Sequence, residues 1–159
     1  MSPYPTVARH EGQPTLMIRV ANARHNIISG ATARLWLIRG EPSPEGQFFR
    51  RYYELDLLRG ENPVFALSWT IFHRIDESSA LYGARPDDLA QADALLVLTI
   101  NGLDDNSAQQ LNARRSYSLA KIRWQHRYVD IASNADDGRL ILDYTKFHVV
   151  TPEEAQDGS

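Results

Sequence analysis

Residues 27–58 read IISGATARLWLIRGEPSPEGQFFRRYYELDLL. From Ala31 to Leu37 every second side chain is small or apolar, and the positions between carry polar or bulky groups. This two-residue period is typical of a β-strand with one buried face. The segment GEPSPEG places two prolines between glycines and predicts a turn, and FFRRYYELDLL predicts the returning strand. Residues 27–58 therefore predict a β-hairpin with an ordered loop.

The same alternation of short strands and turns continues on both sides of this hairpin. Apolar runs predict further strands at residues 15–21, 64–75, 94–100, 108–118, 122–131 and 139–148. Only residues 86–93, with a proline at the start and acids in the first turn, predict a helix, and it is short. About eight short strands at regular spacing predict an all-β sandwich with one short helix.

The chain of 159 residues is long enough for one domain with a full hydrophobic core. Residues 1–13 have no periodic pattern and predict a flexible N-terminal tail. Residues 149–159 are acidic and predict a disordered tail. We therefore expect the domain to span residues 14–148.

Composition excludes several classes of function. A net charge of -3 argues against nucleic acid as the main partner, because such binders carry a basic excess. Without cysteine the chain has no disulfide, thiolate metal site or cysteine nucleophile. No secretory signal is visible, and no apolar run approaches the roughly 20 residues of a membrane helix. The sequence given predicts a soluble chain.

A polar segment, NGLDDN at residues 101–106, directly follows the most apolar run of the chain, residues 94–100. Its two acids, Asp104 and Asp105, allow three interpretations. They could be turn residues, since Asn, Asp and Gly favour turns, or half of a calcium loop that lacks its distal glutamate. In a cyclic oligomer, one acid per subunit would form a charged ring around the axis.

Candidate catalytic groups are few. No histidine pair has the close spacing of a zinc site, and Ser116 with His126 lacks a nucleophile elbow. A metal-assisted hydrolase that uses His126 with Asp130 or Asp143 is a minor hypothesis. Histidines hydrogen-bonded at strand ends are the simpler interpretation. We predict no catalytic residue, no metal site and no cofactor, and hence a protein that is not an enzyme.

Four strings carry a family resemblance: PTLMIRVANARHNIISGATARL, HRIDESSALYG, ARRSYSLAKIRWQHRYVDI and LDYTKFH. In this order and spacing they resemble the cytoplasmic domain of inward-rectifier potassium channels, and the bacterial branch most closely, over roughly residues 12–148. The resemblance implies an immunoglobulin-like β-sandwich, four of which extend the pore of a channel into the cell. Ala80 departs from the family, which usually has proline there, and Lys121 stands where relatives often carry glutamate.

The resemblance also assigns residues. The loop from Asn101 to Ala108 corresponds to a constriction of the cytoplasmic pore, with Gly102, Leu103 and Ala108 at its narrow part. Gly30 and Asn101 stand where strongly rectifying relatives carry acids, so weak block by polyamines is expected. The remaining assignments are Asp105 as an acid in the loop, Arg114 as support of the constriction, and Arg24 as a contact of anionic lipid head groups.

The expected partners follow from the same resemblance. They are three further copies in a homotetramer, the transmembrane pore domain of the channel, potassium ions in transit and anionic lipids, with no nucleic acid. The expected location is the cytoplasmic face of the cell membrane. No selectivity-filter sequence occurs in these 159 residues. The alternative is a free-standing immunoglobulin-like binding module with no channel role.

Overall fold

The computed structural model of the chain describes residues 4–22, 26–65, 68–85, 87, 93–128, 132–134, 136–142 and 149–152. It consists almost entirely of strands. In chain order they are β1 (Thr6–His10), β2 (Gln13–Ala21), β3 (Ile28–Pro42), β4 (Phe48–Leu55), β5 (Glu61–Phe65), β6 (Ser68–Arg74), β7 (Leu95–Asp104), β8 (Gln109–Ser118), β9 (Arg123–Trp124), β10 (His126–Tyr128), β11 (Ala132–Asn134), β12 (Leu140–Leu142) and β13 (Val150–Pro152), with a 3₁₀ turn, η1 (Leu119–Lys121), before β9.

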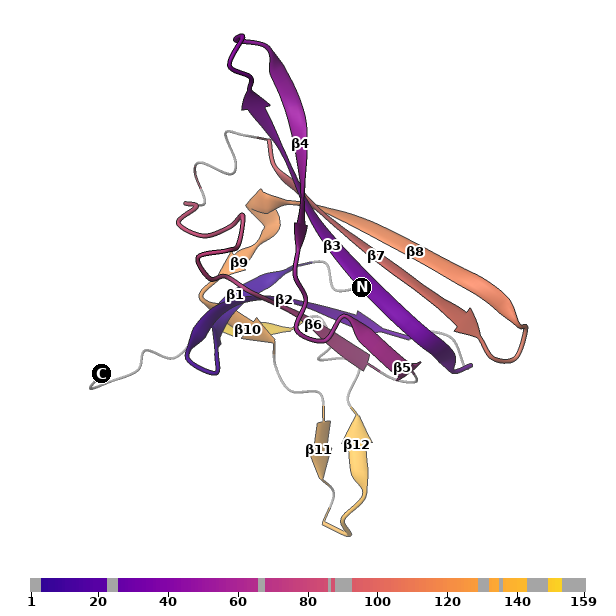
Figure 1. Cartoon of the computed structure of the whole chain (residues 1–159). Helices are drawn as coiled ribbons and strands as arrows, with labels where there is room; N and C mark the ends of the chain where they lie inside the picture. Colours follow the sequence, from indigo (N-terminus) through magenta and orange to yellow (C-terminus); the bar gives the residue numbers. More distant parts are fainter. Residues whose placement is uncertain are drawn as a thin grey trace.

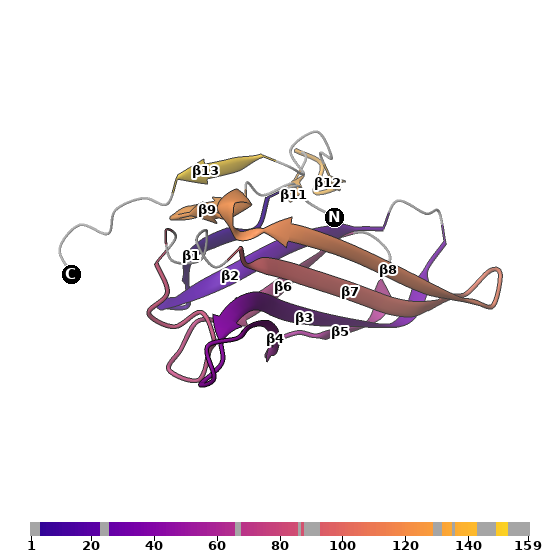
Figure 2. The same cartoon turned by 90° about the horizontal axis from the view of Figure 1, so that it is seen from above.

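Two larger sheets form the body of the molecule. The first has the order β4-β3-β7-β8, with β5 pairing the other end of β3, and the second has the order β6-β2-β1-β9. Figures 1 and 2 show the two sheets packed face to face. Two small antiparallel pairs, β10 with β13 and β11 with β12, complete the described strands. The predicted all-β sandwich is confirmed.

The core lies between the two sheets and follows the alternation seen in the sequence. Strands β3 and β7 contribute Leu35, Leu37, Leu96 and Leu98, and strand β2 contributes Ile18, each at most 1% exposed. Because successive side chains of a strand point to opposite faces, burying every second residue of β3 leaves the others on the outer face. Burial of each such side chain contributes about 1.5–3 kcal/mol, so the alternation also fixes which face of β3 is outward.

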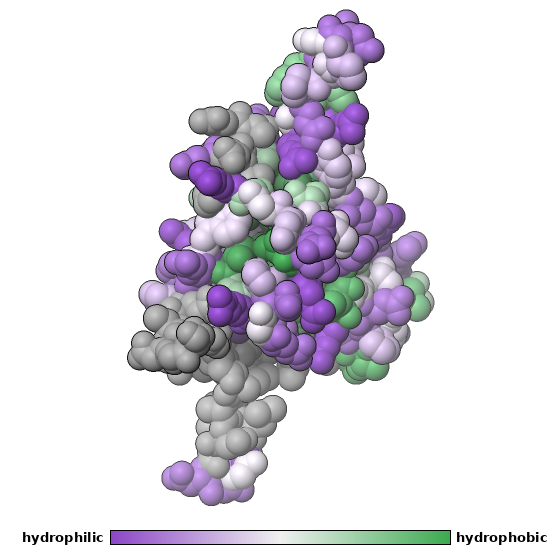
Figure 3. All heavy atoms as spheres, turned by 60° about the vertical axis from the view of Figure 1, so that its left-hand side comes forward, coloured by the Kyte–Doolittle hydropathy of each residue, from purple (hydrophilic) through white to green (hydrophobic). Residues whose placement is uncertain are grey.

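The predicted hairpin is formed by β3 and β4 and projects beyond the body (Figure 1, top). Its strands pair from Leu35 opposite Leu55 to Pro42 opposite Phe48. The turn is closed by the amide of Gly46, which donates to the carbonyl of Ser43 at 2.9 Å. Figure 3 shows this projection at its upper end, with apolar atoms beside hydrophilic ones. The predicted turn is confirmed, although the strands reach further into it than the prolines suggested.

Both predicted tails contain a strand. Thr6–His10 forms β1, which pairs with β2 and with β9, and Thr6, Val7 and Ala8 are buried. Val150–Pro152 forms β13 and pairs with β10. The prediction of a tail is therefore wrong for these two segments. β13 pairs with β10, and β1 pairs on one side with β9, and both partners are well separated in the sequence, so short-range periodicity could not reveal them. On its other side β1 forms a local hairpin with β2 around Glu11 and Gly12, which sequence reasoning missed.

Two further predictions need revision or lie outside the described part. The strand predicted at residues 64–75 is two strands, β5 and β6, because residues 61–65 pair with β3 whereas residues 68–74 pair with β2 in the other sheet. The helix predicted at residues 86–93 falls mostly on residues outside the described ones. Within the described residues, no helix is long and apolar enough to cross a membrane.

The motif HRIDESS folds around a buried histidine. His73 is 3% exposed; its Nδ1 lies 2.7 Å from the carbonyl oxygen of Asp56, and its Nε2 lies 2.7 Å from the hydroxyl of Ser79. Because a carbonyl can only accept, Nδ1 carries the proton and Nε2 accepts from Ser79. His73 thus ties the segment after β4 to the turn after β6. A hydrogen-bonded structural histidine is confirmed at this position.

The burial of His73 makes stability depend on pH. Desolvation lowers the pKa of His73 below its usual 6.5, so the unfolded chain binds a proton that the folded chain rejects. Stability is then complete above about pH 6.5 and falls as the pH drops below that value, by at most about 1.4 kcal/mol per pH unit. We expect urea unfolding between pH 7.5 and 5.5 to show this loss in the wild type and less of it in His73→Gln. Equal slopes for the two proteins would contradict the assignment.

Candidate functional site

An open hollow of about 660 Å³ lies on the outer face of the first sheet, where β3, β7 and β8 end. It contains five of the positions that the sequence assigned to the pore wall. The lining residues are Ser29, Gly30, Thr32, Asn101, Gly102, Leu103, Ala108 and Gln110. Residues more than 70 positions apart in the chain are thus brought to one surface.

Strand register explains why these residues meet. Thr32 of β3 lies opposite Asn101 of β7, which lies opposite Asn112 of β8. Directly opposed residues share a face, and Ala31, Ala33 and Ile100 occupy the buried face. The side chains of Thr32, Asn101 and Asn112 therefore form a polar row on the outer face, at the edge of the hollow.

A bulge in β3 places Gly30 in the hollow. The register of β3 against β7 shifts between Ser29 and Thr32, and Gly30 has φ +56° within that interval. Left-handed backbone of this kind suits glycine and strains other residues. The bulge turns Gly30 outward without interrupting the burial of Ala31.

Gly102 is required by a close approach of two strands. A Cβ built on Gly102 would lie 2.4 Å from Cγ2 of Ile28 and 3.4 Å from the Cα of Ala31. Ile28 is itself 3% exposed and branched at Cβ, so its side chain has little room to move. Packing of β3 against β7 at the hollow therefore demands glycine at position 102.

The turn between β7 and β8 is shorter than the sequence suggested. The predicted loop began at Asn101, but β7 continues to Asp104 and only residues 105–108 form the turn. The Asp104 carboxylate accepts from the amides of Asn106 at 3.0 Å and Ser107 at 3.3 Å. Among the three interpretations of the acids, the turn interpretation is confirmed for Asp104, and among the described residues no group of His, Asp and Glu could hold a metal ion.

Asp105 lies at the rim of the hollow and is held to β3. Its carboxylate accepts from the hydroxyl of Ser29, and its amide donates to the carbonyl of Ile27 at 3.1 Å. The side chain is exposed, so its charge is accessible to solvent next to Ser29, which lines the hollow. A ring of such charges in an oligomer stays a prediction.

Arg114 lies on β8 opposite Thr99, exposed on the same outer face as the hollow. It stands two residues along β8 from Asn112. No described residue forms a hydrogen bond or ion pair with it, so its predicted support of the constriction stays a prediction. Arg24 lies outside the described residues, as do Asp130 and Asp143. His126 is described, and its Nδ1 lies 2.7 Å from the carbonyl of Trp124.

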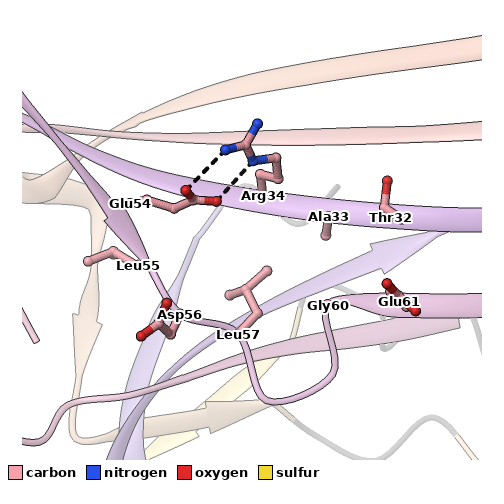
Figure 4. A pocket seen from close by; sticks show the side chains of 9 residues that line it. All are labelled: Thr32, Ala33, Arg34, Glu54, Leu55, Asp56, Leu57, Gly60 and Glu61. Carbon is pink, nitrogen blue, oxygen red and sulfur yellow. Dashed lines mark hydrogen bonds and ion pairs between the residues drawn. The ribbon is translucent and has the colours of Figure 1, made fainter.

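Sequence reasoning missed Glu61. In the structure Glu61 of β5 lies opposite Thr32, so it extends the polar row that continues through Asn101 and Asn112. Glu61 also lines a neighbouring pocket with Thr32 (Figure 4). The predicted strand started at Val64, which left Glu61 in a turn. Only the pairing of β5 with β3 reveals that this carboxylate shares the face of the hollow.

One pair of charges near the row cancels, whereas Arg114 on β8 adds a positive charge to the same face. Arg34 binds Glu54 through two hydrogen bonds, of 2.9 and 3.0 Å (Figure 4). The Arg34 guanidinium lowers the pKa of the Glu54 carboxyl, so the pair is fully charged and neutral as a unit at pH 7. No described residue forms an ion pair with Glu61. Glu61 and Asp105 therefore supply the negative charge on this part of the surface.

The sequence matches the family model of the inward rectifier potassium channel C-terminal domain over residues 1–157. The chain belongs to this family. The match includes β1 and β13, in agreement with their pairing into the fold. It accounts for the β-sandwich, and it confirms the family resemblance found in the sequence.

Several curated proteins are similar to the chain. The inward rectifier potassium channel Kirbac3.1 of Paramagnetospirillum magnetotacticum is 40% identical over 144 residues, which cover 91% of this chain and 49% of that protein. The human ATP-sensitive inward rectifier potassium channel 11 is 31% identical over 92% of this chain and 38% of that protein. The human G protein-activated inward rectifier potassium channel 1 is 29% identical over 92% of this chain and 30% of that protein. The chain thus spans half or less of these relatives, which are potassium channels and not enzymes.

The contact between Gly102 and Ile28 can be tested by mutation. We expect Gly102→Ala to lower the free energy of unfolding by about 1–3 kcal/mol, because the added methyl forces the buried Ile28 to move. Gly60→Ala is the matched control, since a Cβ there would meet its nearest atoms at an ordinary 3.5 Å. Urea unfolding of both variants measures the difference. Equal free energies of unfolding for Gly102→Ala and Gly60→Ala would show that β3 and β7 can accommodate a methyl group at position 102 without loss of stability.

Proposed function

We propose that this chain is the cytoplasmic pore-extending and regulatory domain of a homotetrameric inward-rectifier potassium channel. In that assembly the hollow faces the axis, and potassium ions pass along it after leaving a transmembrane pore domain. Anionic lipid head groups at the cytoplasmic face of the membrane, near Arg24, belong to the same proposal. Membership of the family supports it. The observation that carries it is the gathering of Gly30, Asn101, Gly102 and Leu103 on one open surface.

The charge of this surface determines which cations it would retain. Gly30 and Asn101 provide no carboxylate, and each missing acid removes four charges from a ring of four subunits. Glu61 and Asp105 still supply carboxylates that attract a small permeant cation, and Arg114 on the same face reduces this attraction. A polyvalent amine needs several carboxylates at close range, so we propose that polyamines block this vestibule weakly.

Restoring an acid tests whether Asn101 faces the pathway. In a channel that carries this chain, Asn101→Glu should strengthen voltage-dependent block by spermine by about tenfold or more, because four carboxylates are added to one ring. Gln47→Glu, an equal charge change at the tip of the β3–β4 hairpin, is the control. Gly30→Glu is less informative because φ +56° strains a larger residue. Unchanged block in Asn101→Glu, measured as current against voltage, would remove Asn101 from the pore wall.

The assembly itself is open to a direct measurement. We expect sedimentation equilibrium of the chain at rising concentration to show a tetramer of four 18.0 kDa subunits. Cyclic closure makes the tetramer the end point, so larger species should not accumulate. A monomer at every concentration would contradict assembly through this domain, and a dimer as the end point would contradict fourfold symmetry.

A further inference from the structure

Asp104 is a carboxylate at the end of an apolar row. Along β7 the buried face is occupied by Leu96, Leu98 and Ile100, and Asp104 continues this face with 1% exposure. Burial of an ionised group is costly unless hydrogen bonds replace its water. A buried acid beside the proposed constriction therefore has to be held by its neighbours.

The carboxylate is held from two separate parts of the chain. From its own turn it accepts the amides of Asn106 and Ser107. From the segment before β3, the side-chain amide of Asn26 donates to its two oxygens at 3.3 and 3.4 Å. Asn106 completes the arrangement by donating from its own side chain to Oδ1 of Asn26 at 2.5 Å. We name these three residues, Asn26, Asp104 and Asn106, the clasp.

The clasp is anchored beyond the turn. Asn22, at the end of β2, donates from its side chain to the carbonyl of Asn26 at 2.8 Å and to the carbonyl of Phe65 at 2.9 Å. Next to the clasp, the amide of Asp105 donates to the carbonyl of Ile27. The turn between β7 and β8 is therefore hydrogen-bonded to the connection between β2 and β3. This connection joins the two sheets, because β2 lies in the second sheet and β3 in the first.

The position of Asp104 decides what faces the hollow. Since strand side chains alternate, an inward Asp104 turns Leu103 outward, where it is 44% exposed and lines the hollow. A slip by one residue would put the charged side chain in the hollow and Leu103 in the core. The polar clasp opposes that slip, because the slip would break the hydrogen bonds of the carboxylate to Asn26, Asn106 and Ser107.

We propose that Asp104 is a positioning residue of the constriction: through Asn26 it sets where the turn 105–108 and Leu103 stand, and it couples the β2–β3 connection to the pore wall. The inference rests on the proposed function, because only in a channel is the turn a constriction. The clasp itself can be tested in this chain alone. Any ligand or contact that moves Asn26 would, by this coupling, move the constriction.

Exchanging the two partners tests the clasp. In Asp104→Asn the remaining oxygen can still accept from the turn amides, but the new NH2 group faces the NH2 group of Asn26. Asn26→Asp leaves two carboxylates facing each other. The double variant restores one donor and one acceptor with their positions exchanged, because the amide is then at position 104 and the carboxylate at position 26. We expect each single variant to speed amide hydrogen exchange at Asn106 and Ser107 about tenfold or more, and the double variant to return it to within about threefold of the wild type.

The reference for this measurement lies in the same molecule. Amides of residues 8–10 in β1, which lie beside the β1–β2 turn and pair with the end of β2 remote from Asn22, should stay within about twofold in all variants. If amide hydrogen exchange at Asn106 and Ser107 is as fast in the double variant as in the faster-exchanging single variant, the pairing of Asn26 with Asp104 is overturned. Faster exchange throughout the chain would overturn a local positioning role and leave Asp104 as a general stability residue.

The same variants in a channel that carries this chain distinguish the clasp from the proposed function. We expect the open fraction measured from single-channel records to change at least threefold in Asp104→Asn and to recover in the double variant. Recovery of exchange in the chain, with conduction unaltered in every variant, would show that the clasp exists but that the turn is not a constriction. That outcome would overturn the proposed role of the turn and this inference with it.

Discussion

The structure depends on the register of a single long strand. β3 pairs with β7 along most of its length, with β4 at one end and with β5 at the other. Its buried face supplies Leu35 and Leu37 to the core, and its outer face supplies Thr32 to the polar row. Because side chains alternate along a strand, the burial that stabilises the sandwich also determines the composition of the hollow. One constraint thus sets both the core of the sandwich and the surface of the hollow.

Two glycines and the bulge allow the first residues of β3 both to pack into the core and to line the hollow. Gly30 turns outward at φ +56° while Ala31 stays buried, and Gly102 allows the backbone of β7 to approach Ile28. Neither glycine provides a functional group. Each permits a backbone path that a side chain would block, and together they bring the ends of β3 and β7 close enough to form one wall.

Charge on the outer face is sparse and placed by pairing. Arg34 and Glu54 neutralise each other, so the charge around the polar row depends on Glu61, Asp105 and the cation Arg114. Asp104, next in sequence to Asp105, has its charge buried and satisfied by the clasp. Two adjacent aspartates thus have different environments: one orders the turn from inside and the other presents its charge outside.

The sequence by itself determined the fold class, the family, and the positions of most strands, because alternation and turn residues are local signals. It also predicted structural histidines, of which His73 is one, and the family strings predicted Gly30, Asn101, Gly102 and Leu103 as pore-wall positions, which the structure gathers on one surface. Tertiary structure alone decided the strand β1, the inclusion of Glu61 in the polar row, the true start of the turn at Asp105, and the burial of Asp104 against Asn26. The places of Glu61 and Asp104 depend on contacts with Thr32 and Asn26, far away in the chain, and such a partner is chosen by the packing of the whole sandwich and not by any short pattern. β1 and the turn after β7 belong to hairpins of consecutive strands, and their exact bounds depend on the sheets in which these hairpins pair.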